Sequence, residues 1–182
     1  TAQASAQLFA PDAFVSIDAS GLVRITVSRG EMGQGVRTSL PRIPADELEA
    51  ELSRVQVVQG LAHPRYGDQN TDGSRSIRYL YEPMRKMGAI AKAMLIAAAA
   101  QKWEVPETEC TAENHFIVHS SGKKVGFGDL VEIAKTLEVP NEETLQLKDP
   151  KDFKIIGKTY QTVGERYEDH KKLVIKSIFF PK

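Results

Sequence analysis

The alternation of apolar and polar residues predicts a β-hairpin near the start of the chain. Residues 14–18 (Phe-Val-Ser-Ile-Asp) alternate with a period of two, residues 19–21 (Ala-Ser-Gly) favour a turn, and residues 22–27 (Leu-Val-Arg-Ile-Thr-Val) resume the alternation. This pattern is typical of strands that bury one face. A helix beginning near Pro44 and reaching Leu52 should follow, and then a compact strand at residues 55–58.

The strongest helical pattern lies between Ile77 and Trp103. Apolar residues recur there every three or four positions through about six turns, which predicts one long amphipathic helix. Pro83 either marks its first turn or kinks a helix that has already begun near Ser74. We interpret the methionines of this face as core residues. The apolar positions are Leu80, Tyr81, Met84, Met87, Ala91, Met94, Leu95 and Ala98.

Shorter elements follow the long helix. Residues 116–119 and 123–125 predict a second hairpin, and a short amphipathic helix should run from about 127 to 137. Together these elements predict an α+β fold, with a mixed β-sheet and packed helices. We expect a flexible N-terminus at 1–8, an α+β domain at 9–138, a charged connector at 139–158, and a divergent tail at 159–182 that contains a possible strand.

Composition limits the possible functions. The 182 residues are 41% hydrophobic, and 24 basic residues balance 24 acidic ones, so we expect one or two globular units and no nucleic-acid partner. The single cysteine, Cys110, excludes an internal disulfide. Residues 89–100 fall short of the roughly 18 apolar residues that span a bilayer, so no transmembrane segment is expected. Thr1 to Gln7 resemble a cleaved signal site, which suggests the bacterial periplasm; the alternative location is the cytoplasm.

The titratable residues suggest neither a metal site nor a catalytic group. Of the four histidines, only His115 and His119 are close in sequence. On a strand they lie about 13 Å apart, too far to hold one ion. The chain contains no Gly-x-Ser-x-Gly motif, and paired carboxylates such as Glu49 and Glu51 are interpreted as solvated surface. We therefore assign no catalytic and no metal-binding residue.

The most distinctive segment is residues 31–35, Glu-Met-Gly-Gln-Gly. It does not fit a dinucleotide fingerprint, because Thr38 replaces the third glycine, and it lacks the lysine of a phosphate-binding loop. The Gln34 amide offers donors and an acceptor, while we expect the neighbouring backbone N–H groups to stay exposed. A flat, polar, phosphate-bearing heterocycle suits this loop. For the motif alone, a plain structural turn is the alternative.

The sequence around this loop extends the interpretation. Residues 27–38 (Val-Ser-Arg-Gly-Glu-Met-Gly-Gln-Gly-Val-Arg-Thr), 45–48 (Ala-Asp-Glu-Leu) and 53–57 (Ser-Arg-Val-Gln-Val) closely resemble the xanthine dehydrogenase and aldehyde oxidase family. The most similar branch is that of the isoquinoline 1-oxidoreductase β-subunits, with agreement from Phe9 to Lys158. The resemblance implies that 9–138 is part of a molybdopterin-binding domain.

In that family, the glycine–glutamine loop lies against the cofactor, so the resemblance assigns cofactor contact to Gly33, Gln34 and Gly35. Residues 70–76 resemble a second, serine-rich loop. From this loop we carry over Gly73, Ser74 and Ser76, which would lie at the positive N-terminal end of the long helix. Two residues depart from the family pattern: Pro44 interrupts a helix that is usually unbroken, and Asp72 replaces a small neutral residue.

The resemblance implies a molybdenum enzyme that hydroxylates an N-heterocycle or oxidises an aldehyde. Its cofactor would be molybdopterin with Mo, expected as the cytosine dinucleotide, and electrons would leave through 2Fe-2S clusters on an iron–sulfur small subunit. The general-base glutamate of the family lies in a region that this chain lacks. We therefore expect the chain to need the remainder of the large subunit and to be inactive alone. Two alternatives are a split or truncated interaction domain of this lineage that binds no cofactor, and an unrelated domain with a chance glycine turn.

Overall fold

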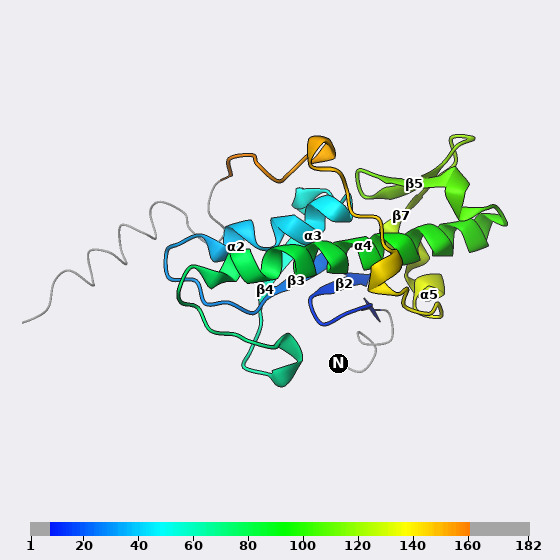
Figure 1. The fold of residues 1–182 in the computed structure, drawn as a ribbon. Helices are drawn as coiled ribbons and strands as arrows, with labels where there is room; N and C mark the ends of the chain where they lie inside the picture. Colours follow the sequence, from blue (N-terminus) through cyan, green and yellow to red (C-terminus); the bar gives the residue numbers. More distant parts are fainter. Residues whose placement is uncertain (1–7, 161–182) are drawn as a thin grey trace, which may run out of the picture.

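The computed structural model describes residues 8–160 and contains two β-sheets. The first is a four-stranded mixed sheet. Its strands, in spatial order, are β1 (Leu8–Phe9), β2 (Val15–Asp18), β3 (Val23–Val27) and β4 (Val55–Gln59). The first three are antiparallel, and β4 runs parallel to β3 (Figure 1). The predicted hairpin and the strand after it are confirmed. Most of the expected flexible N-terminus and the possible strand of the tail lie outside the described residues.

Two short helices connect the parallel strands, α2 (Val36–Ser39) and α3 (Arg42–Glu47). Pro44 is tolerated because it lies in the first turn of α3, where an N–H has no partner within the helix. The prediction of a helix reaching Leu52 is wrong. Glu49 adopts φ +60°, which ends the helix, and Leu52–Arg54 form a 3₁₀ turn, η1.

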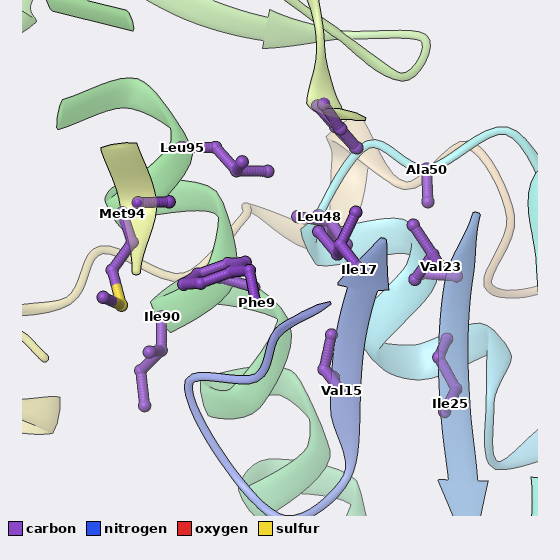
Figure 2. Packing of buried hydrophobic residues seen from close by; sticks show 14 of the residues in the cluster. Phe9, Val15, Ile17, Val23, Ile25, Leu48, Ala50, Ile90, Met94 and Leu95 are labelled. Carbon is purple, nitrogen blue, oxygen red and sulfur yellow. The ribbon is translucent and has the colours of Figure 1, made fainter. Parts of the chain in front are cut away.

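Helix α4 (Arg75–Trp103) confirms the long amphipathic helix and begins two residues before the predicted start at Ile77. Pro83 lies inside it, so the helix has already begun near Ser74, and it continues through Pro83 to Trp103. The predicted core residues Met84, Ala91, Met94, Leu95 and Ala98 are buried. Figure 2 shows Ile90, Met94 and Leu95 of α4 in the same cluster as Phe9 and the β2 and β3 side chains.

A second, three-stranded antiparallel sheet lies near the C-terminal end of α4 (Figure 1). It contains β5 (Cys110–Glu113), β6 (Phe116–His119) and β7 (Lys124–Gly126). The predicted hairpin is confirmed as β6–β7, whereas β5 was not predicted. The helix predicted at 127–137 is shorter: a 3₁₀ turn, η4 (Phe127–Leu130), precedes α5 (Val131–Ala134).

The remaining regular segments are single 3₁₀ turns. They are η2 (Pro64–Tyr66) in the loop after β4, η3 (Glu107–Glu109) before β5, and η5 (Glu142–Thr144) and η6 (Pro150–Asp152) in the predicted connector. The mixed sheet, the antiparallel sheet and the packed helices match the predicted α+β class. Among residues 8–160, no helix is long and apolar enough to cross a membrane.

Candidate functional site

The loop that follows β3 is organised by the side chain of Glu31. The Glu31 Oε1 atom accepts hydrogen bonds from the backbone N–H groups of Gly33 (2.8 Å) and Gly35 (3.0 Å), and Oε2 accepts one from Arg37 N–H (2.9 Å). Partial burial alone would raise the pKa of Glu31, but these three bonds and the Arg37 charge lower it below its usual value. The carboxylate is therefore charged at neutral pH.

The two glycines of this loop are explained by backbone conformation. Gly33 has φ +93° and Gly35 has φ +82°, in the left-handed region that a side chain disfavours. A Cβ at either position would meet no atom of residues 8–160 within 4 Å. Within this chain, the glycines serve the turn rather than a close approach by another segment.

The Gln34 side chain is also engaged within the loop. Its Oε1 accepts from Met32 N–H (2.6 Å) and its Nε2 donates to the Gly30 carbonyl (2.8 Å). The expectation that the neighbouring N–H groups stay exposed is wrong, because Glu31 and Gln34 accept four of them. Gln34 itself is exposed and keeps one Nε2 hydrogen and one Oε1 lone pair for a further partner.

The second loop leads into α4 through two residues with positive φ, Gly73 (+51°) and Ser74 (+54°). Ser74 occupies the N-cap position, and its side chain makes no capping hydrogen bond within the described chain. Asp72, the departure from the family pattern, is neutralised locally because Arg75 Nε donates to its Oδ1 at 2.7 Å. This loop therefore presents hydroxyl groups without an unpaired carboxylate.

A polar clasp joins the two loops, which are about 40 residues apart in sequence. Gly30 N–H donates to Thr71 Oγ1 at 2.8 Å. The Arg29 guanidinium, only 1% exposed, donates to the Asn70 carbonyl and lies 3.5 Å from an Asp68 carboxylate oxygen. A buried cation with these partners resists separation of the loops, because either loop alone would leave it unpaired.

The clasped loops flank an open hollow of about 460 Å³. Of the predicted site residues, the structure places Gln34, Gly73, Ser74 and Ser76 in its lining, while Gly33 and Gly35 shape the first loop without lining it. Residues that sequence reasoning did not assign complete the wall. They are Met32, Val36, Ser39, Thr71, Asp72 and Ile77. Thr71 and Ser39 are hydroxyl residues near the motifs, but nothing in the neighbouring sequence indicates that they line the hollow.

A second hollow of about 390 Å³ shares Ser39 and Ile77 with the first and continues along α3. Arg42 lies in its wall and stacks over the Tyr160 ring at 4.1 Å. The two hollows are therefore neighbours, and the second one reaches the segment around Ile155.

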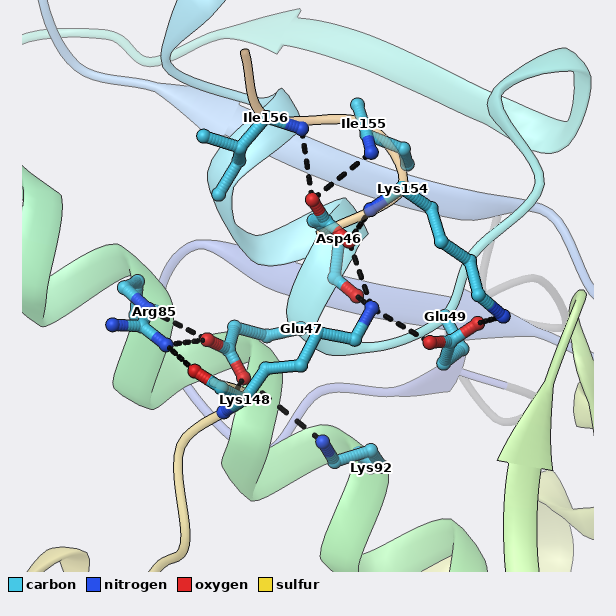
Figure 3. Close-up of polar contacts among 9 residues, drawn as sticks. All are labelled: Asp46, Glu47, Glu49, Arg85, Lys92, Lys148, Lys154, Ile155 and Ile156. Carbon is cyan, nitrogen blue, oxygen red and sulfur yellow. Dashed lines mark hydrogen bonds and ion pairs between the residues drawn. The ribbon is translucent and has the colours of Figure 1, made fainter. Parts of the chain in front are cut away.

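A cluster of buried ion pairs around α3 is structural. Asp46 and Glu47 of α3 are 1% and 0% exposed, and Figure 3 shows them bound by residues 148–156, with Arg85 and Lys92 of α4 on the other side. Asp46 accepts the backbone N–H groups of Lys154, Ile155 and Ile156. Burial alone would raise the pKa of Asp46, but these bonds and Lys148 lower it.

This cluster also corrects one surface assignment. Glu49 is not solvated surface: its side chain is 9% exposed and pairs with Lys148 at 2.6 Å and with Lys154 at 2.7 Å. Glu51 is exposed, as expected. The cluster fixes the last part of the predicted connector onto α3 and leaves no unpaired acid there for catalysis.

The two neighbouring histidines have separate structural roles. His115 is fully buried at the β5–β6 turn, where its Nδ1 accepts Glu51 N–H (3.2 Å) and its Nε2 bonds the Gly21 carbonyl (2.7 Å). His119 bonds Glu109 Oε2 through Nε2 (2.9 Å). Within the described ranges, no three His, Cys, Asp or Glu residues gather closely enough to hold a metal ion.

The chain is similar to known proteins in both sequence and fold. The family model described as the molybdopterin cofactor-binding domain matches residues 1–169. The chain is 33% identical over 129 residues to the β-subunit of isoquinoline 1-oxidoreductase from Brevundimonas diminuta, covering 66% of this chain and 16% of that protein. It is also 33% identical over 123 residues to the membrane-bound aldehyde dehydrogenase (pyrroloquinoline-quinone) of Gluconacetobacter polyoxogenes, covering 68% and 16%.

A third curated relative is a subunit of nicotinate dehydrogenase from Pseudomonas putida, 26% identical over 146 residues, covering 80% of this chain and 12% of that protein. The chain thus spans at most 16% of the length of these relatives. Two solved structures share the fold: quinoline 2-oxidoreductase from Pseudomonas putida 86 (TM-score 0.50, 23% identity) and Cu,Mo-CO dehydrogenase (TM-score 0.53, 22% identity). Each covers 64% of this chain, which covers 15% of each.

Proposed function

Because the chain belongs to the molybdopterin cofactor-binding domain family, we propose that the hollow between its two loops forms part of the site that holds the molybdenum cofactor. One observation carries the proposal: two loops distant in sequence, both singled out by their resemblance to cofactor loops, are clasped around one hollow. Gln34, Ser74 and Ser76 would contact the cofactor, and Gly33, Gly35 and Gly73 would shape the loops that present them.

The residues of the hollow fit such a group. Its volume lies within the range of about 300–1,000 Å³ that is usual for ligand sites. Hydroxyl groups and the free positions of the Gln34 amide suit the polar edges of a pterin, while Met32, Val36 and Ile77 offer apolar contact to its ring. The start of α4 adds backbone N–H groups and a positive dipole end. When bound, the cofactor supplies the redox chemistry; this chain's residues orient it.

We further propose that the complete enzyme hydroxylates an N-heterocycle or oxidises an aldehyde. The names of the curated relatives support these two substrate classes. The chain would act with the remainder of a molybdenum-binding large subunit and with a small subunit that carries 2Fe-2S clusters. The cofactor would be the cytosine dinucleotide, and the neighbouring second hollow of about 390 Å³ is where its extension would lie. A periplasmic location remains part of this proposal.

The test measures molybdenum and pterin fluorescence per mole of the assembled enzyme. Gln34→Ala should lower both, because it removes the side chain that meets the cofactor and the two bonds that fix the loop. Gln101→Ala, an exposed glutamine near the other end of α4, is the matched control and should retain both. Equal metal and pterin in the two variants would reject the proposed contact. A parent enzyme without either would favour the alternative, an interaction domain that binds no cofactor.

A further inference from the structure

Glu31 belongs to none of the residues assigned to cofactor contact, yet it makes more hydrogen bonds than any other side chain of the first loop. We propose that Glu31 is a positioning residue, whose carboxylate holds this loop in the conformation in which Gln34 lines the hollow. The inference rests on the proposed function, because it assigns Gln34 the task of meeting the cofactor.

The geometry of the loop requires an acceptor at this place. The N–H groups of Gly33, Gly35 and Arg37 converge on one carboxylate, two on Oε1 and one on Oε2. Without it, three donors would face one another across a turn that already contains two residues with positive φ. A carboxylate offers acceptors only, whereas the isosteric amide of glutamine would present a donor to at least one of these N–H groups.

The effect of Glu31 reaches Gln34 through the backbone. Gln34 lies between Gly33 and Gly35, both fixed by Glu31. With its backbone fixed on each side, the Gln34 amide spans from Met32 N–H to the Gly30 carbonyl. One Nε2 hydrogen and one Oε1 lone pair then remain for a ligand. Loss of the carboxylate should therefore release the Gln34 amide without removing any atom of the hollow's lining.

The same contacts also bear on whether the backbone of the first loop can bind an anion. Converging backbone N–H groups in a glycine turn often bind an external anion. Here the charged Glu31 carboxylate already occupies them. An anionic group of the cofactor would therefore have to use other donors of the hollow, such as the Thr71, Ser74 and Ser76 hydroxyls. The first loop would therefore contact the cofactor through the Gln34 side chain, because its backbone N–H groups are bonded to the Glu31 carboxylate.

A ligand-free measurement tests the positioning directly. In NMR spectra of the 182-residue chain, the Gln34 side-chain amide protons should be shifted away from the free-glutamine positions, and the Gly33, Gly35 and Arg37 amides should exchange slowly with solvent. Glu31→Gln should return the Gln34 protons to the free-glutamine positions and speed exchange of the three amides roughly tenfold or more, the effect of losing about 1.4 kcal/mol. Glu82→Gln on α4, which changes charge equally, should leave all four signals unchanged.

A second measurement connects the loop to the cofactor. In the assembled enzyme, Glu31→Gln should lower molybdenum content relative to Glu82→Gln, and Glu31→Asp, which keeps the charge, should restore part of it. Unchanged Gln34 and amide signals in Glu31→Gln would overturn the proposal. Altered signals with full molybdenum content would reject the proposed contact between Gln34 and the cofactor, which belongs to the proposed function. If Glu31→Gln does not fold, the same comparisons are made between Glu31→Asp and the parent chain. If the parent binds no molybdenum, the proposed function fails, and the Gln34 signals still decide whether Glu31 positions Gln34.

Discussion

Gly88 lies where α4 approaches α3 closely, and replacing it with alanine should destabilise the fold. A Cβ at this position would meet the Pro44 carbonyl oxygen at 2.5 Å, the Pro44 Cα at 2.8 Å and the Glu47 Cβ at 2.9 Å. Carbon atoms in good contact lie at about 3.5–4.0 Å, so all three distances require movement. Two of the three atoms are backbone, which cannot rotate away.

The two helices cannot separate freely to admit this methyl group. Glu47 is bonded to Arg85 of α4 at 2.6 Å, and Asp46 is bonded to residues 154–156. Overpacking of this kind costs about 1–3 kcal/mol or more, while alanine gains about 1 kcal/mol over glycine within a helix. Because the clash is with backbone, we expect the upper part of the overpacking range and a net loss of about 2 kcal/mol.

Urea unfolding of the 182-residue chain measures this loss. Trp103, the only tryptophan, reports through fluorescence, and far-UV circular dichroism reports on the helices. With a slope near 2 kcal/mol per M, the midpoint should fall by about 1 M. Ala97→Gly in the same helix should lose about 1 kcal/mol through propensity alone. A Gly88→Ala chain as stable as the parent, measured beside a destabilised Ala97→Gly chain, would refute the close approach of the two helices.

Two further predictions concern pH. Burial raises the pKa of Asp12 from 3.8 to about 6, although the hydrogen bonds from the Phe14 and Val15 N–H groups act in the opposite direction. The stabilising contribution of Asp12 is therefore present at low pH and is lost as the pH rises through about 6. Asp12→Asn should therefore gain up to about 3 kcal/mol over the parent at pH 7.5 and little at pH 4, measured by urea unfolding; a gain independent of pH would contradict this. Burial lowers the pKa of His115, so the unfolded chain takes up more protons and stability should fall as the pH drops below about 6.5. His115→Gln should flatten this pH dependence. If the melting temperature of His115→Gln falls with pH as steeply as that of the parent, the prediction is wrong.

Elements with a clear local period were predictable from sequence. The β2–β3 hairpin and α4 each bury one face, so their apolar residues repeat at fixed spacing. Strand β1 has only two residues, and β5 buries Cys110 between polar neighbours, so neither gives a periodic signal. The end of α3 depends on the left-handed Glu49, which no helix-breaking residue announces.

Contacts between distant segments were beyond local reasoning. Asp46 meets residues about 110 positions away, and His115 bonds Gly21, 94 positions earlier. In the sequence, Asp46 and His115 look like ordinary surface residues, because their polar groups find hydrogen-bond partners only in the folded chain. For the same reason, the Arg29 clasp that unites the two loops could not be anticipated, although both loops were identified separately.

The glycine–glutamine motif shows how the structure changes the interpretation of a recognised pattern. Read as a sequence, its glycines suggested backbone exposed to a ligand. In the folded chain they allow φ values that turn three N–H groups onto Glu31, so the backbone is satisfied before any ligand arrives. A loop ordered by its own contacts would lose less conformational entropy when a ligand binds. Under the proposed function, recognition would then depend on Gln34 and on the hydroxyls across the hollow, and Glu31, the acidic residue at the start of the motif, would make this arrangement possible.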